Sequence, residues 1–148
     1  MEGKVEEVVK ATLRRKFDPC TSYRELSSSS RHKTTRVGEG VQAACGDTRC
    51  CDRSWTWDHP DWAGPQWYRF LGAAGSKMIE SNPGVNYCGT NYPGWLVGGH
   101  PSPGEQVNRT VQFQYNNQTV EVLVYNCFGY YVYKLPDVPL CNLGYCGE

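Results

Sequence analysis

Residues 107–135 read VNRTVQFQYNNQTVEVLVYNCFGYYVYKL and carry the strongest structural pattern in the chain. Apolar and polar residues alternate over 107–115 and again over 119–125, which is typical of strands with one buried face. Two asparagines separate these segments, and asparagine tolerates the positive φ of a tight turn. Residues 128–135 are rich in tyrosine and predict a third strand. The stretch therefore predicts an antiparallel hairpin followed by one further strand.

The segments on either side of this stretch are less regular. Residues 66–71 predict another strand, whereas residues 72–105 contain many glycines and prolines and predict loops held by Cys88. Residues 136–148 predict an extended tail that is held by its two cysteines. The sequence thus indicates a small, loop-rich β domain, with α+β character at most.

The N-terminal segment differs in character from the rest of the chain. Apolar residues recur at helical spacing over residues 1–17, which predicts a separate amphipathic helix or a linker that ends before Asp18-Pro19. The segment lacks the apolar run of a signal peptide. We therefore expect either a fragment of a longer protein or a misannotated start, followed by one domain over residues 18–148.

A polar stretch follows the first cysteine. Residues 27–40 begin with four serines, continue through the basic run from Arg31 to Arg36, and end in a segment with two glycines. This composition predicts a mobile loop whose basic residues form a solvated face. The alternative is a contact with a glycosaminoglycan or another acidic partner.

Length and charge exclude several classes of function. The chain has 148 residues, which suits one domain, with 15 basic and 15 acidic residues and a net charge of zero. A neutral chain argues against a nucleic-acid partner. No apolar stretch reaches the length of a membrane span, so we expect no direct membrane insertion by this segment.

Eight cysteines are the most informative part of the composition. The count is even, the spacing is wide, and no C-x-x-C occurs, so disulfides are favoured over a zinc site or a thioredoxin-type site. No metal and no cofactor are expected. Spacing alone does not choose the pairs among Cys20, Cys45, Cys50, Cys51, Cys88, Cys127, Cys141 and Cys146.

Two N-glycosylation sequons agree with an oxidising compartment. Asn108 and Asn117 each begin an N-x-T motif on the predicted hairpin. Together with the cysteines, the sequons predict an extracellular or secreted protein.

A cluster of aromatic residues lies at 55–68. In a loop-rich, disulfide-held domain such residues are expected to form the core. The alternative is an exposed platform that stacks on sugars, with Trp55, Trp57 and Trp62 as the ligand-contact residues.

The sequence contains no catalytic motif that we could identify. Nucleophile elbow, P-loop, dinucleotide-binding and H-E-x-x-H patterns are absent. Asp58-His59 and His100 lie next to prolines and are interpreted as turns. We therefore predict that the chain is not an enzyme.

The order of several short motifs over residues 18–148 resembles the cysteine-rich domain of the uromodulin and pancreatic secretory granule major glycoprotein family. A similar domain occurs in the von Willebrand factor D and EGF domain-containing protein. The motifs that carry the resemblance are Asp18-Pro19-Cys20, Cys51-Asp52, Trp67-Tyr68-Arg69-Phe70, Cys88-Gly89-Thr90, Gly99-His100-Pro101, Tyr130-Tyr131-Val132-Tyr133 and Leu143-Gly144-Tyr145-Cys146.

The resemblance implies a β-rich, non-enzymatic extracellular module with a defined disulfide pattern. Carried over by position, that pattern implies the bonds Cys20–Cys127, Cys51–Cys141 and Cys88–Cys146. Cys45 and Cys50 have no counterpart in the family and are expected to pair with each other. Either Cys50 or Cys51 takes the long-range bond.

The chain also departs from the family. Cysteines of two further family disulfides are missing, near Asn82 and around residues 111–119. Family members are known as decoys whose mannose-rich glycans engage bacterial fimbrial lectins, but two family sequon positions are Val97 and Lys134 here. The decoy function therefore does not transfer residue by residue. The resulting hypothesis is a recognition or scaffold module of a secreted or membrane-anchored glycoprotein, with an unidentified protein or glycan-binding partner; the alternative is a carbohydrate-binding module that uses the tryptophan cluster.

Overall fold

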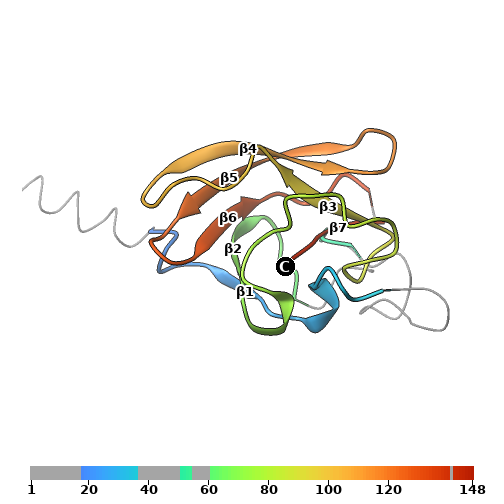
Figure 1. Ribbon diagram of the computed structural model, residues 1–148, viewed down its shortest axis with the longest axis horizontal. Coiled ribbons are helices and arrows are strands. Elements are labelled where there is room, and N and C mark those ends of the chain that lie inside the picture. Colours follow the sequence, from blue (N-terminus) through green and yellow to red (C-terminus); the bar gives the residue numbers. More distant parts are fainter. Residues whose placement is uncertain (1–17, 37–50, 55–60, 141) are drawn as a thin grey trace, which may run out of the picture.

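The computed structural model describes residues 18–36, 51–54, 61–140 and 142–148, which form a seven-stranded sheet (Figure 1). The strand order is β1-β2-β6-β5-β4-β3-β7, in which the two outermost pairs are parallel and the inner pairs antiparallel. The strands are β1 (Arg24–Leu26), β2 (Gln66–Phe70), β3 (Tyr92–Val97), β4 (Gln106–Phe113), β5 (Thr119–Asn126), β6 (Tyr131–Leu135) and β7 (Leu143–Tyr145).

Helical structure is confined to two short turns in this part of the chain. The 3-10 helices η1 (Ser29–Arg31) and η2 (Gly72–Ala74) are the helices that the described residues contain. A β-rich domain with disulfides is therefore confirmed. The predicted N-terminal helix over residues 1–17 lies outside the described residues.

The predicted hairpin and third strand are confirmed. β4 and β5 pair in antiparallel register with Val107 opposite Val124, and β6 continues on the other side of β5. Asn116 and Asn117 have φ values of 48° and 55°, the left-handed conformation that the turn between β4 and β5 requires. Alternate residues of these strands face the core, as the sequence pattern predicts.

The prediction that residues 72–105 form only loops is wrong, because β3 lies within them. Pro93 and Gly94 interrupt the apolar pattern of this strand, so it carries no sequence signal. Gly94 is needed for packing, since a Cβ at this position would lie 2.6 Å from side-chain atoms of Val111 and Phe113 on β4. The predicted tail likewise contains β7, whose three residues are all buried.

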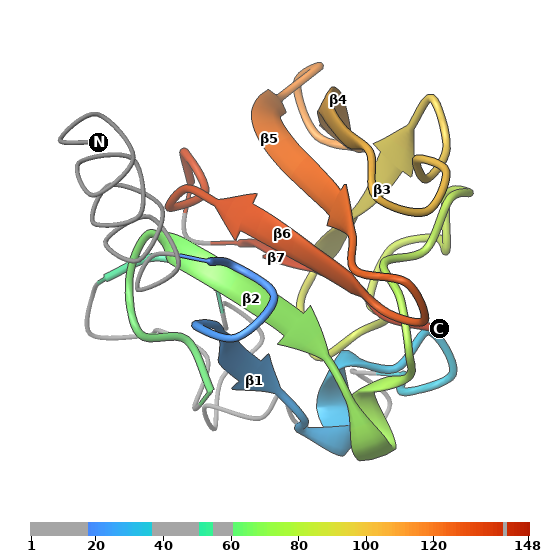
Figure 2. The same cartoon turned by 90° about the vertical axis from the view of Figure 1, so that its left-hand side faces the viewer.

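The sheet is curled (Figure 2). The segments that follow its two edge strands, β1 and β7, meet in a bridge between His32 and Gly147. Gly147 follows β7, and its amide donates to the carbonyl oxygen of Arg31 at 2.9 Å, while the Lys33 amide donates to the Gly147 carbonyl oxygen at 2.8 Å. Gly147 also forms an isolated bridge to Met78. The curled sheet encloses most of the core and leaves an outer face toward solvent.

The enclosed core is rich in aromatic side chains. Trp62 stacks on Tyr68 with ring centroids 4.8 Å apart, and Phe70 meets Tyr133 edge to face at 5.5 Å. Such pairs contribute about 0.5–1.5 kcal/mol each beyond the area that they bury. The other fully buried members include Leu26, Met78, Leu96, Val111, Phe113, Val124, Leu135, Leu143 and Tyr145.

Two disulfides join distant segments of the described chain. Cys20 is bonded to Cys127 and Cys88 to Cys146, with Cα atoms 5.8 and 5.3 Å apart. Both pairs are those that the family resemblance implies. Cys51 is also disulfide-bonded. Its expected partner Cys141 lies outside the described residues, as do Cys45 and Cys50.

The interpretation of the basic run as a solvated face is wrong at Arg31. This side chain is fully buried, and its guanidinium contacts the carboxylates of Asp52 and Asp61. These acids lie 21 and 30 residues further along the chain, so local composition gave no sign of the pairing. Residues 37–40 of the predicted loop lie outside the described residues.

Candidate functional site

The outer face of the sheet carries the side chains that alternate with the core residues. Residues directly opposite each other in a sheet share a face. Asn108 of β4 lies opposite Leu123 of β5, which lies opposite Lys134 of β6, which lies opposite Trp67 of β2. We define the outer face by Trp67, Trp95, Val97, Asn108, Thr110, Gln112, Glu121, Leu123, Tyr125 and Lys134.

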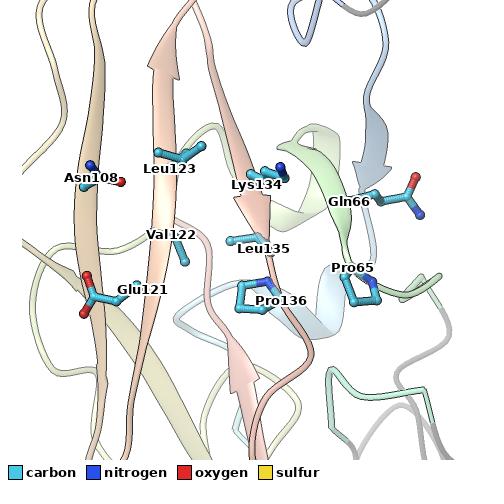
Figure 3. Close-up of a pocket in the computed structure, with 9 residues that line it drawn as sticks. All are labelled: Pro65, Gln66, Asn108, Glu121, Val122, Leu123, Lys134, Leu135 and Pro136. Atoms are coloured by element: carbon cyan, nitrogen blue, oxygen red, sulfur yellow. The ribbon is translucent and has the colours of Figure 1, made fainter.

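A groove of about 260 Å³ opens on this face, across β4, β5 and β6 and beside the start of β2 (Figure 3). We call it the Asn108 groove. It combines apolar surface from Leu123 and two prolines with polar atoms on the flanking strands. Its lining includes Pro65, Gln66, Asn108, Glu121, Leu123, Lys134 and Pro136.

Both sequon asparagines are exposed. Asn108 lies within β4, and the hydroxyl of its sequon partner Thr110 donates to Glu121 Oε1 at 2.8 Å. Asn117 lies at the β4–β5 turn, beside a second and separate hollow that Trp95 and Val97 help to line. The hairpin thus places two acceptor sites at different points of one surface.

Trp62 does not belong to an exposed aromatic platform. Only 5% of it is exposed, it stacks on Tyr68, and its indole Nε1 donates to Asp137 at 3.0 Å. Its assignment as a ligand-contact residue is therefore wrong, because the ring is buried in the core and is not accessible to a ligand. The other two proposed contacts, Trp55 and Trp57, lie outside the described residues, as does Asp58-His59.

The buried Arg31 cluster is structural. Arg31 forms a fork with Asp52, and Asp52 Oδ2 also accepts the Tyr145 amide at 2.7 Å. Burial alone would lower the pKa of Arg31, but the charges and hydrogen bonds of Asp52 and Asp61 outweigh it and raise the pKa. The arginine therefore stays charged and joins the polar stretch to β7. This cluster is not predictable from the local sequence, although Asp52 lies beside Cys51 in the motif that carries the family resemblance.

His100 forms a second polar cluster rather than only a turn. Its Nδ1 lies 2.5 Å from Glu80 Oε1 and its Nε2 lies 2.6 Å from the Tyr133 hydroxyl, which accepts the Met78 amide. Since an ionised Glu80 can only accept, Nδ1 carries the proton and Nε2 accepts from Tyr133. Protonating Nε2 would turn it from an acceptor into a donor. The buried Tyr133 hydroxyl could then no longer donate its proton to His100.

The environment of His100 sets the direction of its titration. Burial lowers the pKa of His100 and outweighs the hydrogen bond and charge of Glu80, while Lys77 lowers it further. Hydrogen bonding from His100 lowers the pKa of Glu80. Both groups thus favour the folded state when His100 is neutral and Glu80 is ionised.

Stability is therefore expected to decrease as the pH falls. The ordinary pKa of histidine is 6.5, so below this pH the unfolded chain binds a proton at His100. The folded chain does not yet bind it, because the pKa of His100 is lower there, and the free energy of unfolding therefore decreases. One proton limits this slope to about 1.4 kcal/mol per pH unit. Glu80 adds a further loss below its ordinary value of 4.5.

Urea unfolding at pH 7.5 and pH 5.5 measures this slope. His100→Gln removes the titrating ring and should flatten the slope, whereas the matched control His32→Gln keeps His100 and should retain it. An unchanged slope in His100→Gln would contradict the assignment.

The described segments hold neither a metal-ligand cluster nor a membrane-spanning helix. No group of three or more His, Cys, Asp or Glu side chains in these segments could hold a metal ion. None of their helices is long and apolar enough to cross a membrane.

Comparison with known proteins finds one family and several relatives. A family model described as a uromodulin-like domain matches residues 68–147. The pancreatic secretory granule membrane major glycoprotein GP2 of Homo sapiens is 35% identical over 136 residues, which is 88% of this chain. Uromodulin of Mus musculus is 36% identical over 137 residues, also 88% of the chain. The chain spans only 22% and 18% of the lengths of these two relatives.

Proposed function

The chain belongs to the uromodulin-like domain family, and from this membership we propose that it is a non-enzymatic extracellular module that presents N-glycans from its β4–β5 hairpin. Such a module would be part of a longer secreted or membrane-anchored glycoprotein. It would act through surface contacts with a protein or glycan-binding partner.

The disulfides support the extracellular location. Cys88–Cys146 is buried and Cys20–Cys127 closes a separation of 107 residues. Disulfides of this kind persist in oxidising compartments and are rare in the cytosol. The relatives named GP2 are described as glycoproteins of a secretory granule membrane.

The exposed sequons on one hairpin are the observation that carries glycan presentation. Asn108 lies on the outer face and Asn117 at the turn, so neither glycan would have to enter the core. Val97 and Lys134, where the resemblance places family sequons, belong to the same outer face as Asn108. Although the chain lacks the two family sequons, a glycan on Asn108 would therefore still be displayed on the same surface.

The buried polar clusters support a non-enzymatic role. Arg31, Asp52 and Asp61 satisfy one another, and Glu80 and Tyr133 occupy both ring nitrogens of His100. Each of these clusters joins segments that are distant in sequence and so stabilises the fold. The carbohydrate-binding alternative loses Trp62, because the core covers its ring.

Expression of the chain through a mammalian secretory route tests glycan presentation. Mass spectrometry of the peptides is expected to show glycans at both sequons, and a mannose-specific lectin is expected to bind the protein when the glycans are kept in oligomannose form. Asn108→Gln and Asn117→Gln should each remove one glycan and reduce lectin binding, and the double variant should abolish it.

The double variant must remain folded for this result to count. Asn108 is exposed in a strand, so Asn108→Gln should change the free energy of unfolding by no more than about 0.5 kcal/mol. Asn117 has a φ of 55°, which asparagine tolerates better than glutamine, so Asn117→Gln should cost about 1 kcal/mol. Unoccupied sequons in a correctly folded, secreted chain would refute glycan presentation and leave the family assignment intact.

A further inference from the structure

We propose that the glycan on Asn108 folds back onto its own chain and occupies the Asn108 groove, so that its first sugars cover the outer face at Leu123 and Lys134. This inference rests on the proposed function, because it requires an occupied sequon. It adds a binding site within the chain and assigns the ligand chemistry, which is the N-acetylglucosamine core of an N-glycan.

Asn108 places the attachment point of its glycan at one end of a row of residues that crosses the sheet. Asn108, Leu123 and Lys134 form one row across β4, β5 and β6, as Figure 3 shows. Neighbouring strands lie about 4.8 Å apart, so the row from Asn108 to Lys134 spans about 10 Å. The first sugars of the glycan lie on this row if the chain of sugars runs along the surface rather than away from it.

The groove offers both kinds of contact that a sugar ring requires. Leu123 and the two prolines present apolar surface to the C–H face of a ring. Glu121 and Lys134, both exposed, supply a carboxylate and an ammonium group for hydroxyl and N-acetyl groups.

The polar side chains on the rim of the groove, Glu121 and Lys134, can form further hydrogen bonds. Thr110 uses only one oxygen of Glu121. Within the segments that the structure describes, the Lys134 side chain makes no hydrogen bond or ion pair. A glycan could therefore bond to both side chains without breaking a contact of the fold.

The size of the groove favours a tethered ligand over a free one. Its volume of about 260 Å³ is below the range of roughly 300–1,000 Å³ that is typical of pockets for free small molecules. A covalent tether raises the effective concentration to about the millimolar range, so weak contacts suffice for occupancy. A glycan on Asn108 has this advantage, since its attachment point is part of the groove wall.

Asn117 provides an internal comparison. It lies at the tip of the β4–β5 turn and does not line the Asn108 groove. Both glycans are attached to the same molecule, so they are digested by the same enzyme at the same temperature, and the stability of the protein is the same for both.

Native digestion with a peptide N-glycosidase tests the inference. The chain is produced with uniform oligomannose glycans, and the release rates at Asn108 and Asn117 are followed separately by mass spectrometry. Leu123→Ala and Lys134→Ala should each raise the ratio of Asn108 release to Asn117 release about three- to tenfold, as expected for losing up to one factor of ten in local binding. The matched control Val85→Ala removes exposed apolar surface at a position that lines neither the Asn108 groove nor the hollow beside Asn117, and it should leave the ratio unchanged.

A second measurement observes the contact directly. With ¹³C-labelled glycans, the N-acetyl methyl protons of the first two sugars should show nuclear Overhauser contacts to the Leu123 methyl groups. If Asn108 carries a glycan but these contacts are absent and the ratio does not change in Leu123→Ala, the glycan extends into solvent, and the inference fails while glycan presentation stands. An unoccupied Asn108 overturns both.

Discussion

Replacing Arg31 with methionine is expected to lower the free energy of unfolding by about 3–5 kcal/mol, because it leaves a buried carboxylate without its cation. Asp52 is fully buried and receives both terminal nitrogens of the Arg31 guanidinium. Methionine has a similar length but supplies no positive charge. Among the residues that the structure describes, the Tyr145 amide would then be the one remaining backbone donor to the Asp52 carboxylate.

The expected loss also reflects the position of Arg31 in the sheet. Its backbone oxygen accepts the Gly147 amide and its side chain donates to the Tyr145 carbonyl oxygen at 3.1 Å. These contacts hold the segment after β1 against the end of β7. Methionine keeps the backbone bond to Gly147 but loses the side-chain bond to Tyr145, so the contact between these two segments is weakened.

Urea unfolding at pH 7 with the disulfides intact measures this effect. Lys33→Met is the matched control, because Lys33 belongs to the same polar stretch but is 46% exposed, and its pair with Glu148 at 3.1 Å is expected to contribute at most about 1 kcal/mol. Arg31→Lys retains the charge without the planar fork and should fall between the two. If Arg31→Met cost no more than Lys33→Met, the buried cluster would not stabilise the fold.

Removal of the Cys88–Cys146 disulfide is expected to cost more than removal of the Cys20–Cys127 disulfide, although it closes the shorter loop. The sequence separations are 58 and 107 residues. Loop-closure entropy alone gives a loss of about 4–5 kcal/mol for either bond and slightly favours the longer loop. Burial reverses this order.

The two bonds differ in what surrounds them. Cys88 and Cys146 are 1% and 0% exposed and pack with Ile79, so a pair of alanines leaves a cavity there. Cys20 and Cys127 are only half-buried, so their replacement removes the cross-link with little loss of packing. We expect the difference between the two double alanine variants to be about 1–2 kcal/mol.

The comparison requires Cys88→Ala/Cys146→Ala and Cys20→Ala/Cys127→Ala, each measured by urea unfolding under oxidising conditions. The double substitutions avoid a free thiol that could exchange with the remaining bonds. The opposite order of stabilities would mean that loop entropy, and not packing, decides the contribution of each bond.

The extent to which the fold could be predicted depends on how local its signals are. The β4–β5 hairpin was predictable because alternation and turn residues lie next to each other in the sequence. β3 was not, since its strand conformation depends on pairing with β4 and β7, and Gly94 reflects a close approach of side chains from another strand. The three-residue strands β1 and β7 are too short to show a period.

The candidate site shows the same division. Both sequons are readable as three-residue motifs. The groove beside Asn108 is not, because Leu123 and Lys134 reach it only through the registers of β5 and β6. Trp62 was compatible with two opposite roles until the fold placed it on Tyr68.

By itself, the sequence determined the class of the protein: a β-rich, disulfide-linked domain of the uromodulin-like family with two sequons on a hairpin. Those properties reside in short motifs, in alternation and in the order of cysteines. The tertiary structure alone decided that Arg31 is buried, that Gly147 joins the segments after the two edge strands, and that Asn108 lies on a groove. The reason is physical, since burial and charge pairing depend on residues that are distant in the chain and become neighbours only when the sheet has curled.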